Sequence, residues 1–168
     1  MTRLITVVIA TFSTALVVAS GVALAQEPIE CGPAKEKHNI LEHKNQHPSP
    51  DAAPDKAIVY VIRKPGARWR WMGQSKLALN GRWVAVLNRG QYTFFESDPG
   101  LLRLCFAGAS GTRTLNSYLL LTAQAGQTYY VRVDTGAMAS EAAAFEVDAG
   151  EGRGLVKQST YVTWEVKK

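Results

Sequence analysis

From Lys56 to the carboxyl terminus, the chain consists of short runs rich in β-branched and aromatic residues, separated by turn residues at intervals of about ten. This spacing is typical of sandwiches and barrels, because each strand needs a turn before the chain can return to a sheet. Residues 57–62 are apolar at every position, which predicts a strand inside a sheet. We therefore expect residues 56–168 to form one all-β domain, a single antiparallel β-sandwich of about 7–9 short strands.

Turn residues divide this region into individual strands. The predicted strands cover residues 57–62, 75–79, 82–87, 91–96, 101–107, 117–123, 128–134 and 160–166. Asn80-Gly81 accepts the positive φ of a type I′ turn, so the second and third strands are expected to form a hairpin. Asp98-Pro99-Gly100 predicts a reverse turn. Residues 124–127 predict a second hairpin.

The segment that follows has less regular patterning. Residues 137–145 are rich in alanine and fit a helical turn, whereas residues 144–147 alternate as an edge strand does, and the pattern leaves both open. Glycines at positions 150, 152 and 154 predict a loop. They do not predict a phosphate cradle, because the strand-to-helix context and the terminal Lys-Ser/Thr are missing.

Residues 1–25 have the layout of a signal peptide. A basic start at Arg3 is followed by an apolar run that ends in Ala23-Leu24-Ala25, and small residues at these positions predict cleavage after Ala25. The alternative is an uncleaved anchor, because an apolar run of about 18 residues can span a bilayer. Hydroxyl residues dilute the run, so we expect a periplasmic or secreted protein without a stable membrane span after cleavage.

Residues 26–55 are polar and interrupted by prolines, which predicts a tail or linker. A short helix over residues 35–47 would have almost no apolar face to bury. Cleavage removes one charge, Arg3, from a net formal charge of +5, and the rest is uneven: residues 26–55 carry −3 and residues 56–168 carry +7. A basic exported domain is suited to anionic surface polymers, although solubility explains the same charge.

The chain has two cysteines, Cys31 and Cys105. Export places both in an oxidising compartment, so a disulfide between them is the simplest expectation. The alternative is a pair of free thiols, with Cys105 buried in an apolar strand.

Several stretches of the domain resemble one known family. They are residues 56–61, the hairpin at 79–85, 90–94, Pro99-Gly100 and 125–132. On these stretches the chain resembles a bacterial family of exported small β-domains, number twenty-eight forty-six in the series of domains of unknown function, whose architecture is akin to PEGA-type sandwiches. The resemblance covers about residues 56–157 and implies fold and export, but it brings no catalytic residues. The chain departs from the family at Leu101-Leu102 and in a Trp-Arg insertion at 68–71.

Catalytic and metal-binding patterns are sparse. All three histidines (His38, His43 and His47) fall in the predicted tail, so a nucleophile–histidine mechanism on the domain would need one to fold back. A helix would place His43 and His47 on one face as metal ligands, but a solvated tail is the simpler interpretation. We expect no metal, no cofactor and no enzymatic activity.

One alternative to this expectation is a periplasmic hydrolase with paired carboxylates. It would use Glu96 with Asp98 or Asp134, and one of the carboxyls would have to be desolvated. Asp98 begins a turn, however, and its side chain is then expected to cap backbone amides.

A Trp-Arg segment is the best candidate for recognition. Its residues, with a tryptophan from the nearby hairpin, are Arg68, Trp69, Arg70, Trp71 and Trp83. In an extended chain, tryptophans and arginines would point to opposite sides. The tryptophans then either complete the core or form a surface that binds sugars, lipid or protein. We expect a non-catalytic module that binds or scaffolds at the bacterial envelope, with an anionic glycan or another envelope protein as partner. Export argues against nucleic acid. A purely structural domain is a further alternative.

Overall fold

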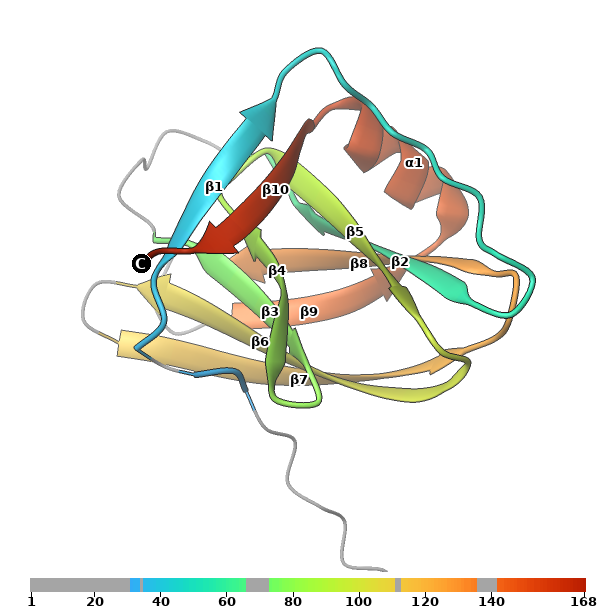
Figure 1. Ribbon diagram of the computed structural model, residues 1–168. Coiled ribbons are helices and arrows are strands. Elements are labelled where there is room, and N and C mark those ends of the chain that lie inside the picture. Colours follow the sequence, from blue (N-terminus) through green and yellow to red (C-terminus); the bar gives the residue numbers. More distant parts are fainter. Residues whose placement is uncertain (1–30, 34, 66–72, 111–112, 136–141) are drawn as a thin grey trace, which may run out of the picture.

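The computed structural model describes residues 31–33, 35–65, 73–110, 113–135 and 142–168, which form two packed β-sheets and one helix (Figure 1). The six-stranded sheet contains, in spatial order, β1 (His38–His43), β10 (Thr160–Val166), β5 (Gln91–Ser97), β2 (Ala57–Arg63), β8 (Thr128–Thr135) and β9 (Ala142–Val147). The four-stranded sheet contains β4 (Arg82–Leu87), β3 (Ser75–Leu79), β6 (Gly100–Ser110) and β7 (Arg113–Ala123). The helix α1 covers Ala149–Lys157. The predicted all-β sandwich is confirmed.

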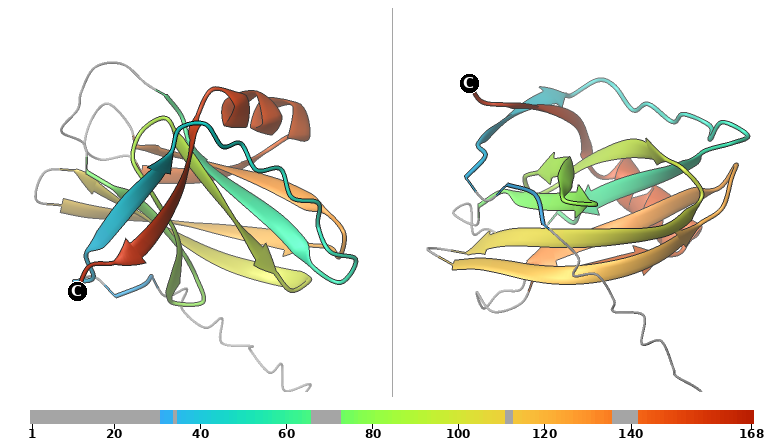
Figure 2. Two further views of the ribbon diagram at one scale, coloured as in Figure 1. Left: turned by 45° about the horizontal axis from the view of Figure 1, so that its top comes forward. Right: turned by 60° about the horizontal axis from the view of Figure 1, so that its bottom comes forward.

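Strand β2 is buried along its whole length because both of its faces are covered. Val59 and Val61 face the four-stranded sheet and pack in one core with residues such as Phe106. Tyr60 and its neighbours on the opposite face pack in a second cluster that includes Leu155 of α1. Figure 2 shows β6 and β7 as a layer below the larger sheet, with α1 on the far side of that sheet. The apolar run at residues 57–62 therefore is an interior strand, as predicted.

The Asn-Gly hairpin is also confirmed. Strands β3 and β4 pair antiparallel, and the turn between them places Asn80 at φ 50° and Gly81 at φ 73°. Both values lie in the left-handed region that this residue pair tolerates.

The strand pairing corrects two expectations. The six-stranded sheet is mixed, not purely antiparallel, because β2 pairs parallel with β8 and β10 pairs parallel with β5. The second predicted hairpin is wrong, since β7 pairs with β6 in one sheet whereas β8 belongs to the other. The turn at residues 124–127 crosses between the sheets. It is held to the start of β2 by backbone hydrogen bonds from Gly126 N to Lys56 O (2.7 Å) and from Ile58 N to Gln127 O (3.0 Å).

Residues 38–43 are not a tail. They form β1, which pairs antiparallel with β10 so that Ile40 lies opposite Trp164. The helix considered for residues 35–47 is therefore wrong. The low apolar content of this segment suits an edge strand, which has only one partner and one face to bury. Residues 31–33 extend the chain onto the four-stranded sheet, where Cys31 and Cys105 form a disulfide with their Cα atoms 5.2 Å apart.

Residues 142–157 bear on two expectations, the choice between a helical turn and an edge strand and the predicted glycine loop. Residues 142–147 form the edge strand β9, so residues 142–145 are not a helical turn, and residues 137–141 lie outside the described residues. The glycine-containing stretch at 150–154 lies within α1 and is not a loop. Asp148 explains the helix, because its side chain accepts hydrogen bonds from the backbone amides of Gly150 (2.8 Å) and Glu151 (3.0 Å) and so caps the first turn.

Candidate functional site

The outer face of the six-stranded sheet, away from the four-stranded sheet, carries a row of aromatic rings. Tyr60 on β2 lies opposite Tyr130 on β8 and Phe94 on β5, and its ring centroid is 5.2 Å and 5.5 Å from theirs. Tyr92 and Tyr161 continue the row. Every second residue of neighbouring strands shares a face, so the register of β5, β2 and β8 brings these rings together.

Helix α1 lies directly against this aromatic row. A Cβ atom at Gly152 would overlap the Tyr130 ring, so only glycine allows the helix to approach so closely. Leu155, one turn further on, is buried against the same cluster. Arg153, Val156 and Lys157, which are close to these two contacts along the helix, line the space beside the sheet.

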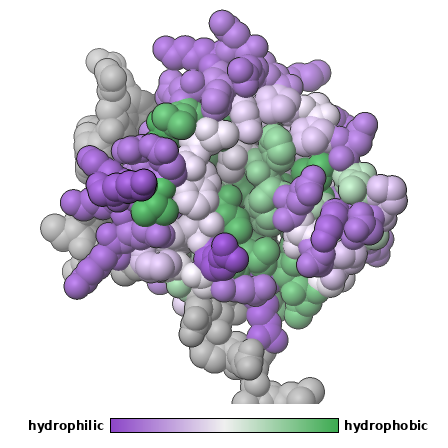
Figure 3. Space-filling view, viewed as in Figure 1, coloured by the Kyte–Doolittle hydropathy of each residue, from purple (hydrophilic) through white to green (hydrophobic). Residues whose placement is uncertain are grey.

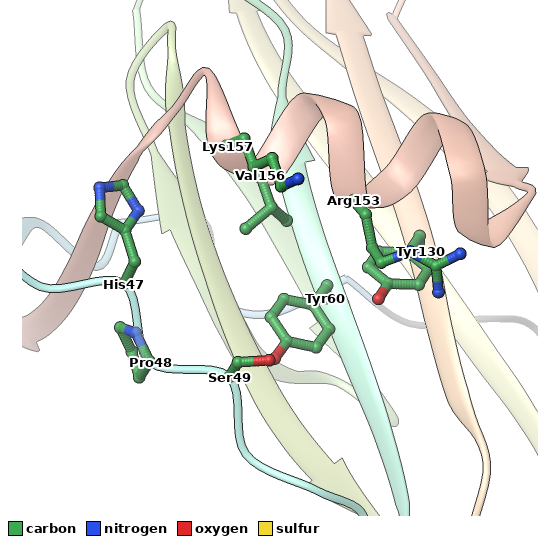
Figure 4. Close-up of a pocket in the computed structure, with 8 residues that line it drawn as sticks. All are labelled: His47, Pro48, Ser49, Tyr60, Tyr130, Arg153, Val156 and Lys157. Carbon is green, nitrogen blue, oxygen red and sulfur yellow. The ribbon is translucent and has the colours of Figure 1, made fainter.

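A pocket of about 340 Å³ opens between α1, the sheet and the segment that leads from β1 to β2. Figure 4 shows Arg153, Val156 and Lys157 of α1 on one side of this pocket. On the other side are His47, Pro48 and Ser49, the ring of Tyr60 lies between the two groups, and the ring of Tyr130 lies beside Arg153. Most of the lining surface is apolar.

Apart from the imidazole of His47, the polar groups of the pocket are of two kinds. Arg153 and Lys157 are exposed and stand one helical turn apart, and among the described residues neither forms an ion pair. Tyr60 directs its hydroxyl toward Ser49 (Figure 4). Burial raises the pKa of Tyr60, while its hydrogen bond with Ser49 acts in the opposite direction. The pocket therefore combines aromatic walls with a basic rim and contains no carboxylate among its lining residues.

The Trp-Arg candidate patch is only partly placed. Arg68, Trp69, Arg70 and Trp71 lie outside the described residues. Trp83 is buried, with 9% of its surface exposed, and packs with Ala78 and Cys105 beneath the segment that contains Gly32. Its indole Nε1 donates to the Pro33 carbonyl at 3.3 Å. Trp83 therefore completes a core and does not contribute to an exposed recognition surface.

The carboxylates proposed for a hydrolase are not assembled as a pair. Glu96 lies opposite Ile58 at one end of β2, whereas Asp134 lies just beyond the residue that pairs with Arg63 at the other end. At about 3.3 Å per residue, this places them more than about 15 Å apart. Asp134 accepts instead from Arg132, with Nε and Oδ2 2.9 Å apart.

Glu96 and Asp98 do line a common open hollow of about 520 Å³. Both are exposed, and Asp98 is paired with Lys56. Hydrogen bonding to Asp98 raises the pKa of Lys56. Neither carboxyl has the desolvated setting that a general acid needs.

The three histidines belong to the sheet and the pocket rather than to a solvated tail. His38 is buried beside Trp164, with ring centroids 5.1 Å apart. Its pKa is lowered by burial and by nearby Lys76, against the opposing effect of Glu36. His43 Nε2 lies 2.9 Å from Thr163 Oγ1, and His47 stacks on Tyr92. Within the described part of the chain, no cluster of three or more metal-ligating side chains occurs.

Sequence reasoning missed this pocket, although two local signals point to its walls. Asp148 and Glu151 have the spacing of a capping box, which marks a helix start. Tyr60 and Tyr130 stand within strand-like runs as aromatic residues with one polar end, a residue type common at binding surfaces. Neither signal shows that these segments meet in space.

Comparisons of the chain with family models, with curated proteins and with solved structures find no match. The resemblance to the family of exported β-domains therefore stays a prediction. In the described residues, no helix has the length and apolar character needed to cross a membrane.

Proposed function

We propose that the chain is an exported, non-catalytic protein that binds an anionic component of the bacterial envelope. The pocket between α1 and the Tyr60–Tyr130 face is the observation that carries this proposal, because it joins apolar walls to two cationic side chains free of ion pairs with described residues. Concave, mostly apolar sites with a few convergent polar groups are the usual form of a ligand site.

Two further features support export. The first 25 residues have the layout of a cleaved signal peptide. The disulfide between Cys31 and Cys105 belongs to a class of bond that persists in oxidising compartments. The anionic ligand agrees with the charge of +7 carried by residues 56–168.

The proposal is tested in a bacterial host that expresses the full chain. Mass spectrometry of the protein in the envelope fraction should show a mature chain that begins at Gln26. This mature protein should be retained on immobilised envelope extract, and added salt should weaken the retention because the contact is ionic. A chain that keeps residues 1–25 in the cytosol, or that is not retained on envelope material, contradicts the proposal.

Two double variants locate the contact. Arg153→Gln with Lys157→Gln removes the basic rim of the pocket and should abolish retention. Trp69→Ala with Trp71→Ala changes the Trp-Arg segment and should leave retention unchanged. If the tryptophan variant loses retention and the Arg153/Lys157 variant keeps it, the binding surface is at residues 68–71 and not in the pocket.

A further inference from the structure

We propose that the pocket takes a small amphiphilic anion, in which one carboxylate or phosphate group is joined to an apolar body. The anionic group would contact Arg153 and Lys157, and the body would lie against Tyr60, Tyr130 and Val156. This inference rests on the proposed function, because it names the class of ligand that the same pocket binds.

The apolar part of the argument comes from the pocket walls. Tyr60 and Tyr130 are 4% and 8% exposed, so they present only the parts of their rings that line the opening. Val156 lies on the opposite wall and is half-buried. A volume of about 340 Å³ lies near the lower end of the range of roughly 300–1,000 Å³ for small-molecule sites, which restricts the body to a short chain or a small ring system.

The sign of the ligand's charge comes from the rim. Arg153 and Lys157 are four residues apart on α1 and therefore share one face of the helix. Glu151, the acid closest to them on the helix, is paired with Arg132, which also pairs with Asp134. Since the lining contains no carboxylate, an anion gains charge-assisted hydrogen bonds at this rim and a cation is repelled.

The orientation of the ligand follows from the position of these groups. Figure 4 shows the basic side chains on the helix and the hydroxyl of Tyr60 turned away from them, toward Ser49. The Tyr60 hydroxyl is thus engaged at the other side of the pocket. On that side Ser49 is hydrogen-bonded to Tyr60 and the ring of His47 is stacked on Tyr92, so a ligand with its charged group at the helix end fits this distribution best.

Isothermal titration calorimetry on the mature protein tests the class with matched eight-carbon probes. Octanoate and octyl phosphate represent the two sources of negative charge, and 1-octanol, octylammonium and inorganic phosphate each lack one required feature. Octanoate or octyl phosphate should bind at least about tenfold more tightly than 1-octanol, a ratio that a pair of charge-assisted contacts readily provides. Octylammonium and inorganic phosphate should show no binding.

Three variants assign the probe to the pocket. Arg153→Gln with Lys157→Gln should lower the affinity for the anionic probe to that for 1-octanol. Val156→Trp fills the cavity and should remove binding of both the anionic probe and 1-octanol. Arg82→Gln removes an exposed cation at the distant β3–β4 turn and should change nothing. Far-ultraviolet circular dichroism and the thermal midpoint of each variant show that the fold is kept.

Failure of the ligand class differs from failure of the proposed function. If 1-octanol or octylammonium binds as tightly as octanoate, or if no probe binds while envelope retention still depends on Arg153 and Lys157, the ligand class is wrong and the function stands. If the anionic probes bind as described while envelope extract does not retain the protein, the ligand class stands and the envelope function is wrong.

Discussion

Single residues control how closely the layers of this molecule approach. Gly152 allows α1 to lie on the ring of Tyr130, and Gly32 allows the amino-terminal segment to lie on the ring of Trp83. In both places a Cβ atom would meet an aromatic ring that is already packed, so substitution forces the segment outward. Both positions need glycine because of its small size, which leaves room for the ring of Tyr130 beside Gly152 and for the ring of Trp83 beside Gly32.

Tyr92 gives the residue scale a measurable pH dependence. It is 0% exposed, and burial raises its pKa to about 12, with further contributions from Tyr60 and Tyr161. A tyrosine in the unfolded chain ionises near pH 10. Because the folded state keeps the proton longer, the free energy of unfolding is unaffected below about pH 10 and falls as the pH rises toward 12, by about 2–3 kcal/mol.

Urea unfolding across this pH range checks the effect. Tyr92→Phe should remove most of the alkaline loss. It should cost little at neutral pH, since the Tyr92 hydroxyl has no hydrogen-bond partner among the described residues. Tyr118→Phe is the matched control, because Tyr118 is 56% exposed. A Tyr92→Phe variant with the alkaline slope of the parent protein would show that other groups cause the loss.

At the scale of elements, the pocket depends on where α1 begins. Asp148 holds the first turn by two hydrogen bonds to backbone amides. The glycines at positions 150, 152 and 154 weaken the helix, since glycine costs about 1 kcal/mol relative to alanine at each interior position. The stability of α1 therefore comes from the Asp148 cap and from packing against the sheet.

Removal of the cap tests this dependence. Asp148→Ala should lower the free energy of unfolding by about 1 kcal/mol and increase amide hydrogen exchange in residues 149–152. Asp148→Ser keeps an acceptor at the same position and should restore most of the loss. Equal hydrogen exchange in the alanine variant and the parent chain would mean that packing alone determines where the helix begins.

Edge strands illustrate a second feature at this scale. The outer strands of the six-stranded sheet, β1 and β9, are short, at six residues each, and four residues of β1 are polar: His38, Asn39, Glu42 and His43. Short edge strands resist pairing with other chains, and polar residues, as in β1, strengthen this effect. Figure 3 shows hydrophilic residues around the rim of one face, with hydrophobic residues gathered toward its middle.

At the scale of the whole molecule, the disulfide connects the amino-terminal segment to the centre of the four-stranded sheet. It joins Cys31 to Cys105 across a sequence separation of 74 residues. Pro33 accepts a hydrogen bond from Trp83, and β1 then continues onto the opposite sheet. The segment thus bridges both layers of the sandwich.

Cys31→Ala measures the value of this bridge. Closing a loop of this length lowers the conformational entropy of the unfolded chain, which contributes up to about 4.5 kcal/mol to the free energy of unfolding. We therefore expect Cys31→Ala to lower the free energy of unfolding by roughly 2–4 kcal/mol. The parent protein in the presence of a reductant should show a similar loss, while the variant should not respond to it. Equal stability of the variant and the oxidised parent would indicate strain that cancels the entropic gain.

The candidate site itself was beyond prediction from the sequence. Its walls come from residues 47–49, from Tyr60 and Tyr130, and from residues 153–157, which are far apart along the chain. No local pattern relates them, because the parallel register of β2 with β8 and the approach of α1 place them together. The sequence also left open whether Trp83 belongs to a core or to a binding surface, because the segment that covers it comes from residues 31–33.

The sequence by itself determined the all-β class, most strands, the Asn80-Gly81 hairpin and the cysteines available for a disulfide. These depend on side-chain periodicity, turn conformation and residue type, which act over a few neighbouring positions. Only the tertiary structure decided that β7 and β8 separate into two sheets, that residues 38–43 form an edge strand and that a basic pocket opens beside α1. Those outcomes depend on which apolar surfaces remain to be covered once the other strands have paired, and this is a property of the whole chain.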